Sequence, residues 1–206
     1  DLVRKAIIPC AGFGTRFLPI TKVVPKEILP IIDTPTLEYI MDEAEQAGIE
    51  EIMLIVSKEK LSAIQRLIEG NLDLNKFLLE VKKDKEYKLA NKERKMKISF
   101  AIQQKMDGNG RAIECAKDFA AGEPIAVLFG DDVMRQTCDR NVTKQLIDAY
   151  EKLEKNVVGC QRTDETIARR CGVMKIKDQI DERTYDINGI IEKPKGDLPS
   201  DLVSLG

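Results

Sequence analysis

Glycines and positively charged residues are concentrated in one short segment, residues 12–30. Gly12 and Gly14 carry no Cβ, so backbone N–H groups near them can approach a ligand closely. The segment has one acid, Glu27, and its three cations are Arg16, Lys22 and Lys26. Three cations and one acid give a local charge of +2 in a chain of formal net charge −2. Prolines keep the segment from becoming a helix, so it predicts a stiff loop that binds a triphosphate.

The spacing of the glycines excludes two common phosphate-binding motifs. A dinucleotide-binding fingerprint needs Gly or Ala at position 17, and Phe17 therefore excludes a Rossmann dehydrogenase. A Walker A loop, G-x-x-x-x-G-K-[ST], is absent. A lone Gly-x-Gly is equally typical of a glycine-rich turn before a solvated basic loop, so other features must decide.

The composition narrows the class of protein. Histidine is absent, which excludes Ser-His and Cys-His catalysis and leaves only oxygen-rich metal sites. Charges of both signs are interspersed, so we expect no nucleic-acid partner. No signal-peptide pattern is present, and no apolar run approaches the roughly 20 residues that span a bilayer, so we expect no membrane partner. The five cysteines are widely spaced, without a C-x-x-C pair, which favours reduced thiols and a cytoplasmic protein.

Apolar runs alternate with amphipathic segments along most of the chain. This alternation predicts an α/β fold with a Rossmann-like, mostly parallel sheet sandwiched by helices. The expected strands are 6–9, 51–56, 98–103, 124–129 and 156–161, and the expected helices are 37–47, 58–69, 112–119 and 143–154. The first strand ends just before Gly12. Because ligands bind at the carboxyl ends of parallel strands, this fold places the glycine loop at the binding edge.

Two segments interrupt the alternation. Residues 71–97 are rich in Lys and Glu with apolar residues at helical spacing, which predicts a helical insertion between two strands. Residues 172–191 alternate polar and apolar side chains, which predicts an antiparallel pair at the far end of the sheet. The last ten residues follow a turn without a closing helix or strand. We therefore expect the natural chain to continue.

Three stretches together resemble a known family. Residues 12–30 match every fixed position of G-x-G-T-R-x-L-P-x-T-K-x-x-P-K-x-x-L-P, the signature of the sugar-1-phosphate nucleotidyltransferases. LFGDD at 128–132 and IIEKPK at 190–195 resemble later parts of the same family. The helical insertion and QQKMDGNGRA at 103–112 are more similar to the bacterial UTP–glucose-1-phosphate uridylyltransferase branch than to the thymidylyltransferase branch.

The resemblance implies a reaction and a cofactor. An oxygen of glucose-1-phosphate attacks the α-phosphorus of UTP, which yields UDP-glucose and releases pyrophosphate. Because the nucleophile is already an anion, no general base is needed, and the absence of histidine is unsurprising. What remains is to align two crowded phosphates and to neutralise their charge. The family does so with cations and Mg²⁺, and it also implies a homo-oligomer, a dimer or a tetramer.

The resemblance also assigns roles in the nucleotide half of the site. Backbone groups of Gly12, Gly14 and Thr15 would cradle the phosphates. Arg16 would clamp the β- and γ-phosphates through its planar fork, and Lys26 would stabilise charge at the α-phosphate.

Base and metal would be held by residues at the ends of other strands. Ala11 and Gly12 can offer backbone groups to uracil, and the Gln103 amide carries both donors and an acceptor. Gly108 would let the base lie flat against the chain. Asp131 would bind Mg²⁺ with phosphate oxygens; its neighbour Asp132 is the alternative, which we disfavour because adjacent strand residues face opposite ways.

The sugar phosphate would be held near the end of the chain, by Gly172, Glu192 and Lys193. The resemblance implies one nucleotidyltransferase domain, 1–206, that is incomplete at its C-terminus, with a helical insertion at 71–97 and the start of the sugar-binding part at 172–206. A second metal carboxylate would lie beyond residue 206. We therefore expect this chain to bind UTP weakly and to turn over poorly or not at all.

One position departs from the branch. Arg111 stands where the usual Gly-Leu-Gly-His-Ala has its histidine, and it could add phosphate affinity or simply face solvent. This departure leaves open the preference for UTP over dTTP, and the resemblance also leaves open another hexose in place of glucose. A rival class is a nucleotide sensor that kept the fold and lost catalysis. A sensor has no need of a metal aspartate beside a sugar-phosphate lysine, so we favour the enzyme.

Overall fold

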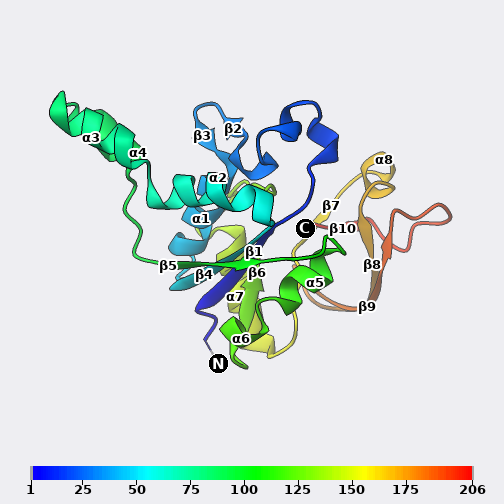
Figure 1. Cartoon of the computed structure of the whole chain (residues 1–206). Coiled ribbons are helices and arrows are strands. Elements are labelled where there is room, and N and C mark those ends of the chain that lie inside the picture. Colours follow the sequence, from blue (N-terminus) through cyan, green and yellow to red (C-terminus); the bar gives the residue numbers. More distant parts are fainter. Residues whose placement is uncertain (1, 206) are drawn as a thin grey trace. The chain divides into compact units, whose positions relative to one another are not determined.

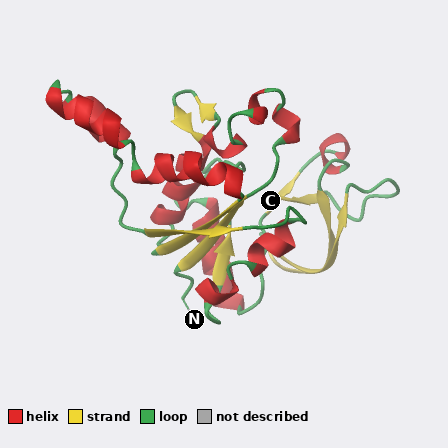
Figure 2. Ribbon diagram, in the orientation of Figure 1, coloured by secondary structure: helices red, strands yellow, loops and turns green. Residues whose placement is uncertain are grey.

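The computed structural model describes residues 2–205. The chain divides into two compact units, Asp1–Glu151 and Lys152–Gly206, which we treat one at a time. Figure 1 labels the elements along the chain, and Figure 2 separates helices from strands by colour.

A parallel sheet forms the centre of the first unit. Its strands are β1 (Lys5–Cys10), β4 (Glu51–Val56), β5 (Lys97–Ile102) and β6 (Ile125–Val127), in the order β5-β4-β1-β6. All three pairings are parallel, which confirms the predicted α/β fold with a mostly parallel sheet. β1 lies inside the sheet and every one of its six residues is buried. A strand covered on both faces needs a nearly continuous apolar run, and Ala-Ile-Ile-Pro-Cys provides it.

Helices and short turns connect these strands. The helices are α1 (Thr36–Gln46), α2 (Lys58–Glu69), α3 (Leu72–Glu80), α4 (Asp84–Ala90), α5 (Asn109–Glu114), α6 (Lys117–Ala120) and α7 (Val142–Leu153). Between β1 and α1 lie three 3-10 turns, η1 (Thr15–Phe17), η2 (Ile20–Lys22) and η3 (Lys26–Ile28), and a small hairpin, β2 (Pro30–Ile31) and β3 (Thr34–Pro35).

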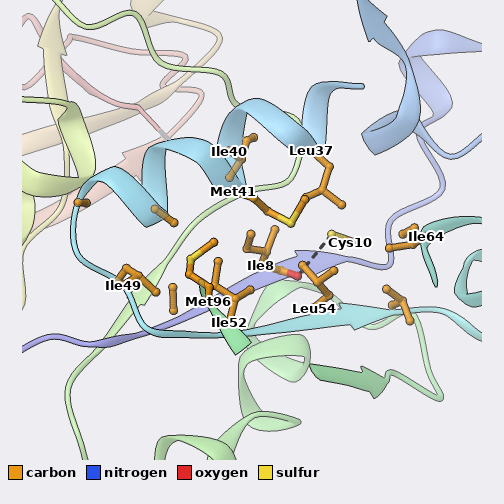
Figure 3. Packing of buried hydrophobic residues seen from close by; sticks show 14 of the residues in the cluster. Ile8, Cys10, Leu37, Ile40, Met41, Ile49, Ile52, Leu54, Ile64 and Met96 are labelled. Carbon is orange, nitrogen blue, oxygen red and sulfur yellow. Dashed lines mark hydrogen bonds between the residues drawn. The ribbon is translucent and has the colours of Figure 1, made fainter. Parts of the chain in front are cut away.

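The two faces of the sheet have separate cores. On one face, Ile8 and Leu54 pack with side chains of α1 such as Leu37 and Met41, as Figure 3 shows. On the other face, Ile7 of β1 packs with Ile55 of β4, with Ala112 of α5 and with Ala116, which directly precedes α6. Successive strand residues point to opposite faces, so each strand contributes to both cores. Helices therefore cover the sheet on both sides, as predicted.

The segment predicted as a helical insertion carries α3 and α4. The side-chain amides of Asn75 and Asn91 donate to each other at 2.8 and 2.7 Å, which ties the two helices together. Where the segment returns to β5, Arg94 is largely buried against three acids of α1: Glu38, Asp42 and Glu45. The predicted domain limits, with the insertion at 71–97 and a sugar-binding part from 172, remain a prediction.

The second unit has a sheet of its own. Its strands are β7 (Cys160–Arg162), β8 (Gly172–Asp181), β9 (Thr184–Glu192) and β10 (Leu202–Ser204), in the order β7-β10-β8-β9, and its helix is α8 (Glu165–Ala168). All of its pairings are antiparallel. Ala168, Val173 and Val203 form its small core.

The second sheet corrects three expectations. The pair over 172–191 is antiparallel as predicted, but it does not extend the parallel sheet. The strand expected at 156–161 is β7, which pairs with β10 instead of joining the parallel strands. We also expected no strand after the last turn, yet β10 lies there. A strand of three residues is too short to produce a periodic pattern, so the sequence did not predict β10.

An ion-pair cluster holds the amino ends of neighbouring strands together. Arg4 lies just before β1 and contacts Glu51 of β4 at 2.5 Å and Glu123, which precedes β6, at 2.8 Å. Lys5 contacts the same Glu123 at 2.9 Å. Hydrogen bonds from Arg4 lower the pKa of Glu51 and of Glu123 below their ordinary value.

We expect the Arg4→Met variant to lose a pH-dependent part of its stability. Because the two glutamates have an ordinary pKa of 4.5 and lower values in the folded chain, their ion pairs stabilise the fold above that pH. This contribution disappears as the pH falls through the lowered pKa values. The free energy of unfolding, measured in urea between about pH 7 and pH 3, should therefore fall more steeply with falling pH for the wild type than for the variant.

The matched control for this measurement is Lys76→Met, which removes an exposed cation from α3. Its free energy of unfolding should change with pH in the same way as that of the wild type. Parallel curves for the wild type and Arg4→Met would contradict the assignment of the two lowered pKa values to Arg4.

Candidate functional site

The glycine loop leaves β1 at its carboxyl end and turns at Gly14. Gly14 has φ of 63°, a left-handed conformation that glycine adopts without strain. Its carbonyl accepts hydrogen bonds from the Phe17 N–H at 3.1 Å and from the Thr21 hydroxyl at 2.6 Å. A Cβ at position 14 would lie 3.1 Å from the Thr21 methyl group, so the turn has little room for another residue. Thr15 and Arg16 follow in η1, both exposed.

Lys26 and Asp131 meet across a large separation in sequence. The Lys26 ammonium donates to Asp131 Oδ2 at 2.8 Å, and both side chains are partly buried, at 23% and 31% exposure. A Cβ built on Gly12 would lie 3.9 Å from Lys26 Cε and Nζ, so the lysine side chain passes beside that glycine. The structure thus brings together one residue predicted to bind phosphate, the predicted catalytic lysine and the predicted metal aspartate.

Asp132 lies beside this group but is held differently. Its backbone N–H donates to the carbonyl of Phe129 at 3.3 Å, which closes a turn after β6. The pKa of Asp132 is raised because protein atoms displace water around its carboxyl, and the charge of Asp131 raises it further. Lys26 and Arg16 both oppose this shift, so the Arg16 guanidinium acts on the same cluster. Of the two neighbouring carboxylates, it is Asp131 that pairs with Lys26.

A buried ion pair beneath the loop was not predicted. Glu27 follows Lys26 directly and is fully buried. Its two carboxylate oxygens accept from the ammonium of Lys60, in α2, at 3.2 and 3.0 Å. In the sequence, the one available signal was that Glu27 is the single acid in a basic loop. Nothing distinguished Lys60 from the other lysines of an amphipathic helix.

Two of the residues expected to recognise the base, Gln103 and Gly108, are in direct contact. Gln103 is buried at the end of β5, and its Nε2 donates to the carbonyl of Gly108 at 3.3 Å. Its backbone N–H donates to the carbonyl of Val56, the last residue of β4, at 2.9 Å. Ala11 is buried and directly follows β1. Ala11 therefore follows β1, whereas Gln103 and Gly108 follow β5, and β4 lies between these two strands in the sheet.

Arg111, the residue that departs from the branch, is engaged with its own neighbours. Its guanidinium contacts Asp107 at 3.3 Å and Glu114 at 2.5 Å, and its side chain is 54% exposed. Hydrogen bonds to these two acids raise its pKa. Of the two expectations, a solvent-facing residue describes Arg111 better, because both partners already neutralise its charge.

The acids present are compatible with Mg²⁺ only if a ligand completes the site. Within residues 2–205, no group of three or more acidic or cysteine side chains is arranged to hold a metal. Mg²⁺ usually keeps several waters and takes one or two carboxylates together with substrate phosphates. Asp131, partly exposed next to a loop suited to phosphates, fits that role as the protein's ligand.

The residues expected to hold the sugar phosphate gather at one end of the β8–β9 pair, within the second unit. Gly172 is the register partner of Glu192, and a Cβ at position 172 would lie 3.2 Å from Glu192 Oε2. Lys193 follows with φ of 46°, and its N–H donates to the carbonyl of Cys171 at 2.9 Å. Its ammonium lies 3.6 Å from Glu192 Oε1. The structure therefore brings these three residues together.

A comparison with known families matches residues 5–206 to the nucleotidyl transferases. The chain belongs to the nucleotidyl transferase family. The match covers the whole glycine loop and every site residue named above, and it confirms the resemblance in the sequence. No helix in the described part of this nucleotidyl transferase is long and apolar enough to cross a membrane.

Curated relatives carry one enzyme name. The chain is 42% identical over 206 residues to UTP–glucose-1-phosphate uridylyltransferase 2 of Staphylococcus saprophyticus, matching 99% of this chain and 70% of that protein. It is 40% identical to UTP–glucose-1-phosphate uridylyltransferase of Bacillus subtilis, matching 99% of this chain and 69% of that protein. The nucleotidyl transferase described here thus spans about 70% of the length of these relatives.

Solved structures share its fold. The UTP-bound UGPase from Acinetobacter baumannii superposes with a TM-score of 0.92 at 29% identity, covering 100% of this chain and 73% of that one. A UDP-glucose pyrophosphorylase complexed with UDP-glucose gives a TM-score of 0.82 at 31% identity, covering 100% of this chain and 75% of that one.

We expect Gly130→Ala to destabilise this nucleotidyl transferase. The new Cβ would lie 2.9 Å from Glu27 Cγ, closer than real Cβ atoms approach other atoms, and 3.0 Å from Cys10 Sγ, which is tighter than most real Cβ contacts. Overpacking of this kind costs about 1–3 kcal/mol, to be measured as the free energy of unfolding in urea. Gly110→Ala is the matched control, since its Cβ would meet no atom within 4 Å. Equal stabilities for the two variants would contradict the tight packing at Gly130.

Proposed function

We propose that the protein is a UTP–glucose-1-phosphate uridylyltransferase, which forms UDP-glucose and pyrophosphate from UTP and glucose-1-phosphate. The observation that carries this proposal is the position of Lys26, 2.8 Å from Asp131 and beside Gly12 at the carboxyl edge of the sheet. Relatives at about 40% identity, matched along 99% of the chain, support the choice of reaction.

The reaction needs charge neutralisation more than proton transfer. The attacking group is a phosphate anion, so a site without histidine is sufficient. The transition state gathers negative charge on the α-phosphate of UTP, and preorganised cations stabilise such charge most effectively. We assign this task to Lys26, and we assign the outer phosphates to Arg16 and to backbone N–H groups of Gly12, Gly14 and Thr15.

The proposed cofactor is Mg²⁺, with Asp131 as its protein ligand and phosphate oxygens of the nucleotide as further ligands. When bound, the ion neutralises phosphate charge as a Lewis acid. Lys26 and Asp131 pair with each other at 2.8 Å, and in this proposal phosphate oxygens become partners of Lys26 and Mg²⁺ becomes the partner of Asp131. Arg16 is exposed and can swing toward a triphosphate.

The base and the sugar are assigned to separate groups. For uracil, Nε2 of the Gln103 amide donates to the carbonyl of Gly108, and among residues 2–205 no donor to its Oε1 is found, so we assign Oε1 to accept from the base. Ala11 and Gly108 offer backbone groups. For the sugar phosphate we assign Gly172 to a close backbone contact, Glu192 to the hydroxyls and Lys193 to the phosphate. A cytoplasmic location and a homo-oligomeric assembly, dimer or tetramer, are part of the same proposal.

We expect pyrophosphate release to be faster with UTP than with dTTP. The full-length protein is assayed with Mg²⁺ and glucose-1-phosphate, and each nucleotide is also titrated without the sugar phosphate to measure its Kd. A strong preference for UTP would also show that Arg111 replaces the usual histidine without harm. Equal rates would overturn the choice of UTP, and tight nucleotide binding without pyrophosphate release would favour the sensor.

We expect Lys26→Ala to lower kcat far more than it weakens UTP binding. Loss of one preorganised donor at a developing anion typically lowers kcat by about 10²- to 10³-fold. Because Lys26 would act on charge that grows in the transition state, the Kd of UTP should change by less than about tenfold. The control Lys76→Ala removes an exposed lysine from α3 and should leave both constants unchanged. A loss of affinity with unchanged kcat would contradict the catalytic role.

A further inference from the structure

A fully buried carboxylate lies directly beneath the proposed catalytic lysine. Glu27 is 0% exposed, and the Lys60 side chain that neutralises it is 12% exposed. Burial raises the pKa of Glu27, and the charge of Lys60 opposes that shift. A buried ion pair contributes little net stability, because desolvation of the two charges offsets their attraction. Well-packed apolar side chains would serve the core equally well, so stability alone does not account for this pair.

The backbone links Glu27 directly to Lys26. Both belong to η3, a single 3-10 turn closed by N–H donation from Ile28 to the carbonyl of Pro25 at 3.0 Å. In so short a turn, the position of one side chain fixes the direction of the next. Because a 3-10 turn has three residues per revolution, successive side chains point about 120° apart, and a Glu27 carboxylate held by Lys60 restricts the direction in which the Lys26 side chain leaves the turn.

Glu27 also packs against the segment that carries Asp131. A Cβ at Gly130 would lie 2.9 Å from Glu27 Cγ, so the two residues are already in close contact. Gly130 immediately precedes Asp131. Glu27 is therefore covalently bonded to Lys26 and in contact with Gly130, the neighbour of Asp131. Lys60 fixes the Glu27 carboxylate to α2.

We propose that Glu27 and Lys60 are positioning residues that hold Lys26 in register with Asp131. Neither touches the substrate in this proposal, which rests on the proposed function for its catalytic consequence. A catalytic group displaced by about 1 Å can lose as much as 10²-fold in rate. Because the contact from Glu27 to Gly130 is made by its aliphatic chain, loss of the charge alone should release the loop without emptying the core.

The test compares Glu27→Gln, Lys60→Met and the double variant that combines them. Each single variant leaves one charge or amide without its partner, whereas the double variant removes both charges and should fold at least as well as the singles. We expect kcat to fall by about tenfold to a hundredfold in all three, with much smaller changes in the KM values. The double variant should therefore recover stability without recovering rate.

Lys5→Met is the matched control. Lys5 is also a buried cation, and it pairs with Glu123 at 2.9 Å at the opposite end of β1. This variant should lose stability but keep kcat at a temperature where it is folded. If Glu27→Gln or the double variant kept the wild-type kcat, or if Lys5→Met lost kcat equally, the positioning role would be overturned.

A second readout judges the positioning without any turnover. The folded full-length protein is labelled with a small acylating reagent and then digested, and mass spectrometry of the peptides gives the rate at which the Lys26 ammonium reacts, which reports how well Asp131 holds it. Asp131→Asn defines the rate for a released Lys26. Glu27→Gln and the double variant should move toward that rate, by roughly threefold to fivefold, and Lys5→Met should not. Unchanged labelling in both would refute the positioning, whereas an inactive wild type with this labelling pattern would refute only the proposed function.

Discussion

The complete burial of β1 is the constraint on which the first unit depends. A strand covered by helices on both faces has no place for a charge along its length, so charged groups collect at its two ends. At the amino end, Arg4 pairs with Glu51 of β4, and Lys5 pairs with Glu123, which precedes β6. At the carboxyl end lie the cluster of Lys26 and Asp131 and the loop that carries it. One end of the strand thus stabilises the fold, and the other presents charge to a ligand.

The carboxyl-end cluster is built in two layers. The outer layer, formed by Arg16, Lys26 and the two aspartates, is partly or fully exposed and can exchange its partners for phosphate oxygens or a cation. The inner layer is the Glu27–Lys60 pair, which solvent barely reaches. Opposite charges lie next to each other in both layers, so neighbouring acids hold Lys26 and Lys60 in place. Preorganisation of this kind is what a reaction between two anions requires.

Much of the first unit could be predicted from the sequence because its signals are local. β1 and β4 are long apolar runs, and the resemblance of the loop to the family signature singled out Gly12, Arg16 and Lys26, whose roles remain predictions. The meeting of Lys26 with Asp131 followed from the rule that parallel strands share a carboxyl edge. The Glu27–Lys60 pair could not be predicted, because burial of a charge depends on side chains that are distant in sequence. β10 was missed because three residues carry no period, and the second sheet was missed with it.

The helical insertion has a further consequence for the chain between α2 and β5. A long flexible connection would oppose the parallel pairing of β4 with β5, since loop closure loses more entropy as the loop grows, by about 0.6 kcal/mol for each doubling. Here the paired amides of Asn75 and Asn91 fasten the two helices to each other, and Arg94 fastens the return to α1. The segments that must be ordered when β5 pairs with β4 are therefore only the short ones before α3 and after α4. Longer or shorter helices could therefore replace α3 and α4 between α2 and β5 without altering the register of β4 against β5.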